Sequence, residues 1–176
     1  GWSYKESRDL TGFIDGTENP SLAEAPEVTL VPEGLPGAGG SVLLVQQWTH
    51  QAAAFEALPV EAQEKVIGRT KLNSTELAEE VRGPASHVSR NVIEVDGVEQ
   101  HIFRRNSPYG TATEHGTMFI GFSCEQSRLA RMLSRMAGAE DGIRDALTFY
   151  TTAVTGAYYF VPSVEALNQF AISEEE

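Results

Sequence analysis

The stretch Val92-Ile93-Glu94-Val95-Asp96-Gly97-Val98-Glu99-Gln100-His101-Ile102-Phe103 decides the fold class of this chain. Two runs with β-branched residues flank Asp96-Gly97, a dipeptide that fits a two-residue hairpin turn. The pattern predicts an antiparallel hairpin in which Val95 faces Val98. A hairpin in the middle of the chain favours an α+β antiparallel sheet with helices on one face over a doubly wound parallel sheet.

The segments on either side of the hairpin predict the rest of the sheet and the helices. Apolar runs of strand length, at residues 41–48, 116–124 and 157–161, are strand candidates. Helices are predicted over residues 50–58 with Thr49 as N-cap, over 59–67 with Gly68 as the stop, over 141–150, and after Ser163. Leu129, Met132, Leu133 and Met136 mark one apolar helical face, and residues 20–40, with four prolines, are expected to form a loop.

Composition limits the possible partners. The chain has 176 residues, enough for one domain, and a formal net charge of −12. This charge argues against nucleic acid and against anionic membranes, because both attract basic surfaces. Cys124 is the single cysteine, so no intrachain disulfide can form. With no signal-peptide pattern and no apolar run of bilayer length, a cytoplasmic location is expected.

The turn Gly12-Phe13-Ile14-Asp15-Gly16-Thr17-Glu18-Asn19-Pro20 holds a carboxylate between two glycines. Glycine lets the backbone approach a ligand closely, so Asp15 is a candidate ligand-facing group. An isolated Asp-Gly is more often an ordinary surface turn. The segments that follow it in the sequence change this interpretation.

Those segments are Pro84-Ala85-Ser86-His87-Val88-Ser89-Arg90-Asn91, Ile102-Phe103-Arg104-Arg105-Asn106-Ser107-Pro108-Tyr109-Gly110 and Thr155-Gly156-Ala157-Tyr158-Tyr159-Phe160-Val161-Pro162-Ser163. Together with the Asp15 turn, and in this order, they resemble the dye-decolorizing peroxidases, a family of haem enzymes. The resemblance runs from about Leu10 to Ser163. It implies a ferredoxin-like fold of the dimeric α+β barrel type, with haem b as cofactor. Residues 1–176 would be a single C-terminal haem-binding domain, preceded in the family by a first domain of comparable size.

His87 is the histidine that the resemblance implies as the axial ligand of the haem iron. A neutral imidazole is a good ligand for haem iron, and His50, His101 and His115 lie outside the matching segments. A ligating imidazole usually donates its other N–H to an acceptor. Asp145 and Asp141 are available for this role, although the family's acidic position falls nearer Thr148, so the partner stays open.

The resemblance places a second group of residues on the opposite side of the haem. Peroxide cleavage needs a group that moves a proton and a positive charge that stabilises the developing negative charge. Asp15 and Arg104 suit these two roles, Asn106 would add a hydrogen bond, and Arg105 is expected to lie on the surface. The resemblance also implies that Arg69 pairs with a haem propionate, and that cofactor binding involves Thr17, Glu18 and Asn19.

The hairpin allows one geometric inference. If its register continued, His87 would face Asn106 across the ladder, with Cβ atoms only ~5 Å apart. Groups that serve opposite faces of a haem cannot both stay in such a ladder. Residues 84–89 are therefore predicted to leave it as a loop or helical turn.

Three functions stay open at this point. The first is a peroxidase that reduces hydrogen peroxide and oxidises bulky aromatic, dye-like or phenolic donors in one-electron steps. The second is a haem-binding module for storage, delivery or iron release, and the third is a ferredoxin-like interaction domain without cofactor. Because a first domain is expected, exposed apolar area should remain beside the Asp15 turn. A homo-oligomer, or association with the N-terminal half, would cover it.

Overall fold

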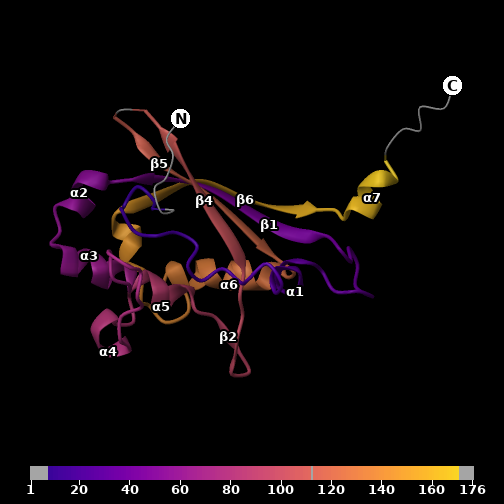
Figure 1. Cartoon of the computed structure of the whole chain (residues 1–176), viewed down its shortest axis with the longest axis horizontal. Coiled ribbons are helices and arrows are strands. Elements are labelled where there is room, and N and C mark those ends of the chain that lie inside the picture. Colours follow the sequence, from indigo (N-terminus) through magenta and orange to yellow (C-terminus); the bar gives the residue numbers. More distant parts are fainter. Residues whose placement is uncertain (1–7, 112, 171–176) are drawn as a thin grey trace.

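The computed structural model describes residues 8–111 and 113–170, and its centre is one four-stranded antiparallel sheet (Figure 1). The spatial order of the strands is β4-β5-β1-β6, and every neighbouring pair is antiparallel. The strands are β1 (Ser41–His50), β4 (Phe103–Gly110), β5 (His115–Ser123) and β6 (Thr151–Val161).

The strand order is that of a ferredoxin-like sheet, because β1 and β4 run parallel with the antiparallel β5 between them. Together with the helices it forms an α+β fold. Figure 1 shows α3, α5 and α6 on the same side of the sheet. The helices are α1 (Ala25–Thr29), α2 (Ala52–Glu56), α3 (Val60–Ile67), α4 (Glu79–Arg82), α5 (His87–Asn91), α6 (Gln126–Met136), the 3₁₀ helix η2 (Ala146–Phe149) and α7 (Val164–Asn168). The predicted fold class is confirmed. The sheet keeps two edges, β4 and β6, and does not close into a barrel.

The core lies between α6 and the sheet. Leu129 and Met132 of α6 are buried against Leu44 of β1, with Leu133 and Met136 packed at the margin. The predicted apolar face of this helix is therefore confirmed. Burial of this face holds the helix layer against β1 and β5.

The Asp96-Gly97 hairpin exists, but it is a small separate ribbon. Only β2 (Glu94–Val95) and β3 (Val98–Glu99) pair, and Val95 faces Val98 as predicted. Phe103 then begins β4 and pairs with Phe122 of β5, so the long strand belongs to the main sheet. The ladder does not extend back to His87, which starts α5, and this prediction is confirmed.

Four local predictions are wrong. Residues 49 and 50 continue β1 instead of starting a helix, because Thr49 pairs with both β5 and β6. Residues 141–150 form turns and then η2, because Asp145 caps η2 by accepting a hydrogen bond from Leu147 N. Residues 20–40 contain α1, whose first turn accommodates Pro26. The last strand begins at Thr151 instead of residue 157, since it pairs with the whole length of β1.

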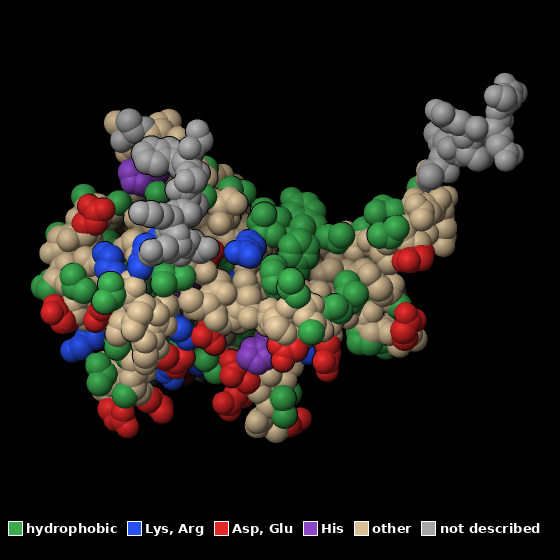
Figure 2. Space-filling view, in the orientation of Figure 1, with side chains coloured by type: hydrophobic (Ala, Val, Ile, Leu, Met, Phe, Trp, Pro, Cys, Tyr) green, Lys and Arg blue, Asp and Glu red, His purple; other side chains and the backbone are tan. Residues whose placement is uncertain are grey.

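The face of the sheet that points away from α6 is strongly apolar. Residues that pair across neighbouring strands point to the same face of the sheet. Leu43 pairs with Phe122 and Tyr159, and Phe122 pairs with Phe103, so these four side chains form one row across it. In Figure 2 hydrophobic side chains gather over this part of the sheet. The described helices lie on the other side of the sheet or at its ends (Figure 1). We call this surface the open face: Leu43, Val45, Phe103, Ile120, Phe122 and Tyr159.

Candidate active site

One wall of a pocket of about 160 Å³ is formed by α5, whose first residue is His87. The hydroxyl oxygen of Ser86 caps the helix by accepting a hydrogen bond from Ser89 N at 3.3 Å. The ring of His87 lines the pocket and contacts Asp145, whose side chain has 0 % exposure. His87 Nδ1 lies 2.7 Å from Asp145 Oδ2.

This contact answers the question of the acidic partner, because Asp145 binds His87 and Asp141 does not. Asp141 is instead exposed and accepts two hydrogen bonds from the buried guanidinium of Arg90, at 2.8 and 2.9 Å. Those hydrogen bonds lower the pKa of Asp141 below its ordinary value. The two carboxylates are close in sequence but have separate tasks: one orients the histidine and the other anchors α5.

The contact with Asp145 also fixes the tautomer of His87. With Nδ1 donating its hydrogen to the carboxylate, the neutral ring has its lone pair on Nε2, the atom that can bind a metal, and Asn91 Nδ2 lies 3.4 Å from it. Asn91, one helical turn later, donates to His87 O at 2.7 Å, and its amide lies beside the ring. The imidazole is therefore held from both sides before any ligand arrives.

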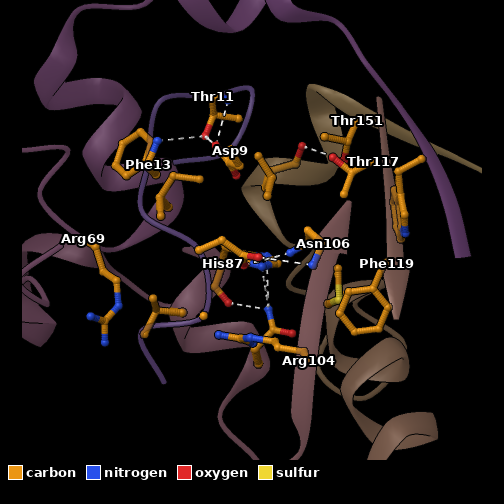
Figure 3. A pocket seen from close by; sticks show the side chains of 18 of the residues that line it. Asp9, Thr11, Phe13, Arg69, His87, Arg104, Asn106, Thr117, Phe119 and Thr151 are labelled. Carbon is orange, nitrogen blue, oxygen red and sulfur yellow. Dashed lines mark hydrogen bonds between the residues drawn. The ribbon is translucent and has the colours of Figure 1, made fainter. Parts of the chain in front are cut away.

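The other wall is the edge strand β4 together with the Asp15 turn. Arg104 and Asn106 alternate along β4 and both line the pocket, as does Asp15. Asp15 accepts hydrogen bonds from the Asn106 side chain at 2.9 Å and from Asn106 N at 3.2 Å. Figure 3 shows His87, Asn106 and Arg104 together in the centre of the pocket. The structure thus brings all three predicted distal residues to the histidine-bearing cavity, and Arg105 is exposed as expected.

On this wall the Arg104 guanidinium is the group that can stabilise a negative charge. Burial lowers the pKa of the Arg104 guanidinium from its ordinary value, and the charges of Asp15 and Glu18 oppose that change. The ordinary pKa of arginine lies far above neutrality, so the group stays charged in a poorly solvated site. A charge in such surroundings interacts strongly with any negative charge that develops beside it.

Arg69 lies to one side of the pocket and is already paired with protein groups (Figure 3). It donates to Ser74 O at 2.6 Å, to Glu76 at 3.0 Å and to Glu18. Glu18 therefore tethers the Asp15 turn to Arg69. Thr17 is exposed at the margin of the pocket, and Asn19 binds the main chain of Arg104. The predicted role of Arg69 toward a propionate stays a prediction.

The space between the walls fits a large planar cofactor with acidic groups. A cavity of about 160 Å³ and a second of about 250 Å³ have His87, Val88, Asn91, Arg104 and Met132 in common, so they are parts of one slot. Its sides are a histidine ready to bind metal and the thioether of Met132. In the outer part, the buried Nε of Arg82 has no hydrogen-bond partner within the described residues. Such a donor suits a carboxylate of the cofactor.

Several residues of the pocket carried no recognisable sequence signal. Asp9 lines it and is bound by Thr11, and burial raises the pKa of its carboxyl. His50 lines the same pocket, contacts Thr117 Oγ1 at 2.8 Å through Nε2, and has its pKa lowered by burial and by His115. The position of His50 depends on where β1 ends and on its pairing with β5, and that of Asp9 on the turn it forms with Thr11 and Phe13.

A histidine backed by a buried carboxylate, facing an aspartate and an arginine across a slot, defines the class of site used by haem peroxidases. Residues 6–166 match the family model described as Dyp-type peroxidase, C-terminal, and the chain belongs to this family. It is 42% identical over 173 residues to a dye-decolorizing peroxidase of Mycolicibacterium paratuberculosis and 41% identical to one of Mycobacterium tuberculosis. These alignments cover 96% of the chain but only 49% and 52% of the relatives.

Solved structures agree with this assignment. The fold matches a dye-decolorizing protein from V. cholerae with a TM-score of 0.90 and 45% identity, over 96% of this chain and 56% of that one. It also matches a variant of Rhodococcus jostii DypB in complex with heme, with a TM-score of 0.90 and 41% identity, over 95% of this chain and 56% of that one. The chain thus spans about half the length of the relatives it matches.

Proposed function

We propose that the chain is the haem-binding part of a peroxidase that reduces hydrogen peroxide and oxidises aromatic donors. One observation carries the proposal: the His87–Asp145 pair and the Asp15–Asn106–Arg104 group face the same slot from opposite walls. A module that only stores or delivers haem needs the first wall and has no use for the second. The assembled second wall favours the enzyme.

The residues divide the work in the following way. Haem, when bound, would supply the iron that binds peroxide and would accept the electrons that the donor gives up. His87 would hold the iron through Nε2, while Asp145 fixes the ring through Nδ1. The Asp15 carboxylate would take a proton from the inner peroxide oxygen and return it to the outer one. Arg104 would stabilise the negative charge that develops between those oxygens.

The electron balance sets how many donor molecules each turnover needs. Reduction of one hydrogen peroxide to two waters consumes two protons and two electrons, so two one-electron donors balance each turnover. A haem that filled the slot would leave little of it for a bulky donor, so aromatic or phenolic donors would give up electrons at the surface. The proposal also keeps a cytoplasmic setting, on the ground of the single buried thiol of Cys124.

The open face provides the argument about assembly. Its rows of half-buried aliphatic and aromatic side chains need a cover, and relatives of about twice the length have enough additional chain to supply one. We propose that an N-terminal half, or a second copy of the chain, packs on this face.

The experiment is a haem titration of the purified chain, followed by rapid mixing with peroxide. The expected result is a Soret band that saturates at one haem per chain and is lost or displaced in His87→Ala. Peroxide should then change the spectrum quickly, and an added phenolic donor should restore it. Binding without a peroxide reaction would favour the storage or delivery module, and no binding at all would favour the interaction domain.

A further inference from the structure

The side chain of Asn19 binds the main chain of Arg104, 85 residues away in sequence. Asn19 Nδ2 donates to Arg104 O at 2.7 Å, and Arg104 N donates to Asn19 Oδ1 at 2.9 Å. Both ends of the amide are therefore used on a single residue of β4. This pair of hydrogen bonds reproduces what a neighbouring strand would make at that position.

The same pattern continues along the outer edge of β4. Every second residue of an edge strand turns its N–H outward, and in the first six residues of β4 these are Arg104, Asn106 and Pro108. Asn19 accepts a hydrogen bond from Arg104 N, and Asp15 accepts one from Asn106 N at 3.2 Å. Pro108 has no backbone N–H. The Asp15 turn therefore covers the edge of β4 by means of side chains, in register with the pleat.

Gly16 makes this arrangement possible. Its φ of 73° lies in the left-handed region, and a Cβ at this position would lie 3.1 Å from Asn19 Nδ2. Asn19 N also donates to Gly16 O at 3.2 Å, which closes the turn. A side chain at position 16 would push the Asn19 amide away from β4.

We propose that Asn19 is a positioning residue, which sets the distance between the Asp15 carboxylate and the Arg104 guanidinium by locking the turn in register with β4. The inference rests on the proposed function for the roles of those two groups. It assigns Asn19 a task other than contact with the cofactor, because both polar ends of its amide are bound to Arg104. Misplacement of a reacting group by ~1 Å can cost up to about 10²-fold in rate.

The test uses Asn19→Ala and Asn19→Asp in the whole chain, with Asn73→Ala as the matched control. Asn73 is an exposed asparagine in another turn, where its side chain accepts hydrogen bonds from Thr70 and Thr75. The first measurement is hydrogen exchange of the Arg104 amide without haem. Asn19→Ala should speed this exchange about tenfold or more, while the control leaves it unchanged.

The second measurement is the rate of reaction with peroxide after haem loading, with haem affinity measured beside it. Asn19→Ala should lower the rate about tenfold and leave the affinity within about twofold of the wild type. In Asn19→Asp a protonated carboxyl can both donate and accept like the amide, whereas the ionised form repels Arg104 O. The ratio of this variant's rate to the wild-type rate should therefore fall as the pH rises through the carboxyl pKa.

Three outcomes overturn the inference. One is wild-type peroxide reactivity in Asn19→Ala, and another is a rate ratio for Asn19→Asp that does not depend on pH. The third is a loss of haem affinity large enough to account for the lower rate, which would make Asn19 a cofactor-binding residue. Arg104→Leu is run in parallel: if it also reacts at the wild-type rate, the proposed function fails with the inference.

Discussion

His87 Nδ1 lies 2.7 Å from Oδ2 of Asp145, a carboxylate with no exposed surface. The other oxygen of Asp145 accepts a hydrogen bond from Leu147 N at 2.9 Å. The acid is therefore immobilised by η2, and the histidine by the acid. Such a charged acceptor increases the electron density of the imidazole, which strengthens its bond to a metal.

Asp145→Asn should therefore weaken the proximal bond while the pocket keeps its shape. We expect haem to bind with lower affinity, by about 10-fold or more, and the Soret band to shift, because an amide is a weaker acceptor than a carboxylate. Absorption titration measures both changes. Asp141→Asn is the matched control: it removes a carboxylate that serves Arg90, so it should affect thermal stability more than the Soret band. Equal spectra for the two variants would contradict the assignment of Asp145.

Arg104→Leu should leave haem affinity nearly unchanged and slow the reaction with peroxide by about 10²-fold or more, the usual cost of one strong charge-stabilising contact. Stopped-flow absorbance measures the rate. Arg105→Leu is the control, because this neighbour is exposed and lies on the opposite face of β4. A similar slowing in both variants would point to a general effect of charge and not to a contact in the pocket.

Asp15→Asn should preserve the bond to Asn106 N and remove the proton acceptor. The expected loss in the peroxide rate is about 10²–10⁴-fold. The variant also presents an amide N–H toward the Asn106 side chain, so we expect Asn106 to rotate its amide and accept. A neutron structure would show this rotation, because it distinguishes the amide oxygen from the nitrogen, and an unchanged rate would mean that another group moves the proton.

His50 predicts a dependence of stability on pH. Its pKa is lowered in the folded chain, so the unfolded chain takes up a proton near pH 6.5 before the folded one does. The stability associated with His50 is therefore complete above pH 6.5 and decreases as the pH falls through the lowered folded value. Thermal unfolding at pH 7.5 and 5.5 should show a smaller drop in Tm for His50→Gln than for the wild type, by about 1–3 °C. An identical drop in Tm would mean that His50 does not contribute to the pH dependence of stability.

The open face predicts self-association of the chain in isolation. Tyr159 is 56% exposed there, and Tyr159→Lys should shift light-scattering mass toward the monomer without loss of haem binding. Leu22→Lys is the control, since Leu22 is 89% exposed in a turn outside the sheet. If both variants or neither change the mass, the open face is not the contact.

The local chemistry of turns made part of this structure predictable. Val95 and Val98 face each other because Asp96-Gly97 fits a two-residue turn, and His87 starts a helix because Ser86 caps it. The sequence did not show whether Asp145 or Asp141 is the partner of His87, since that depends on how η2 packs beside α5, which lies 58 residues earlier. The prediction that Thr49 caps a helix is wrong for a related reason: its pairing with two strands outweighs its preference for a helix cap.

The described part of the chain buries only eight hydrophobic residues, and four of them, Phe13, Ile93, Ile102 and Met132, also line the two cavities of the slot. The pocket is thus cut through the core and does not lie beside it. A haem bound there would be part of the hydrophobic core, and its apolar area would be larger than that of any side chain in the protein. Folding and cofactor loading would then be one linked equilibrium, in which each tenfold excess of haem over its dissociation constant adds about 1.4 kcal/mol of stability. The supply of haem would decide how much of the protein is folded.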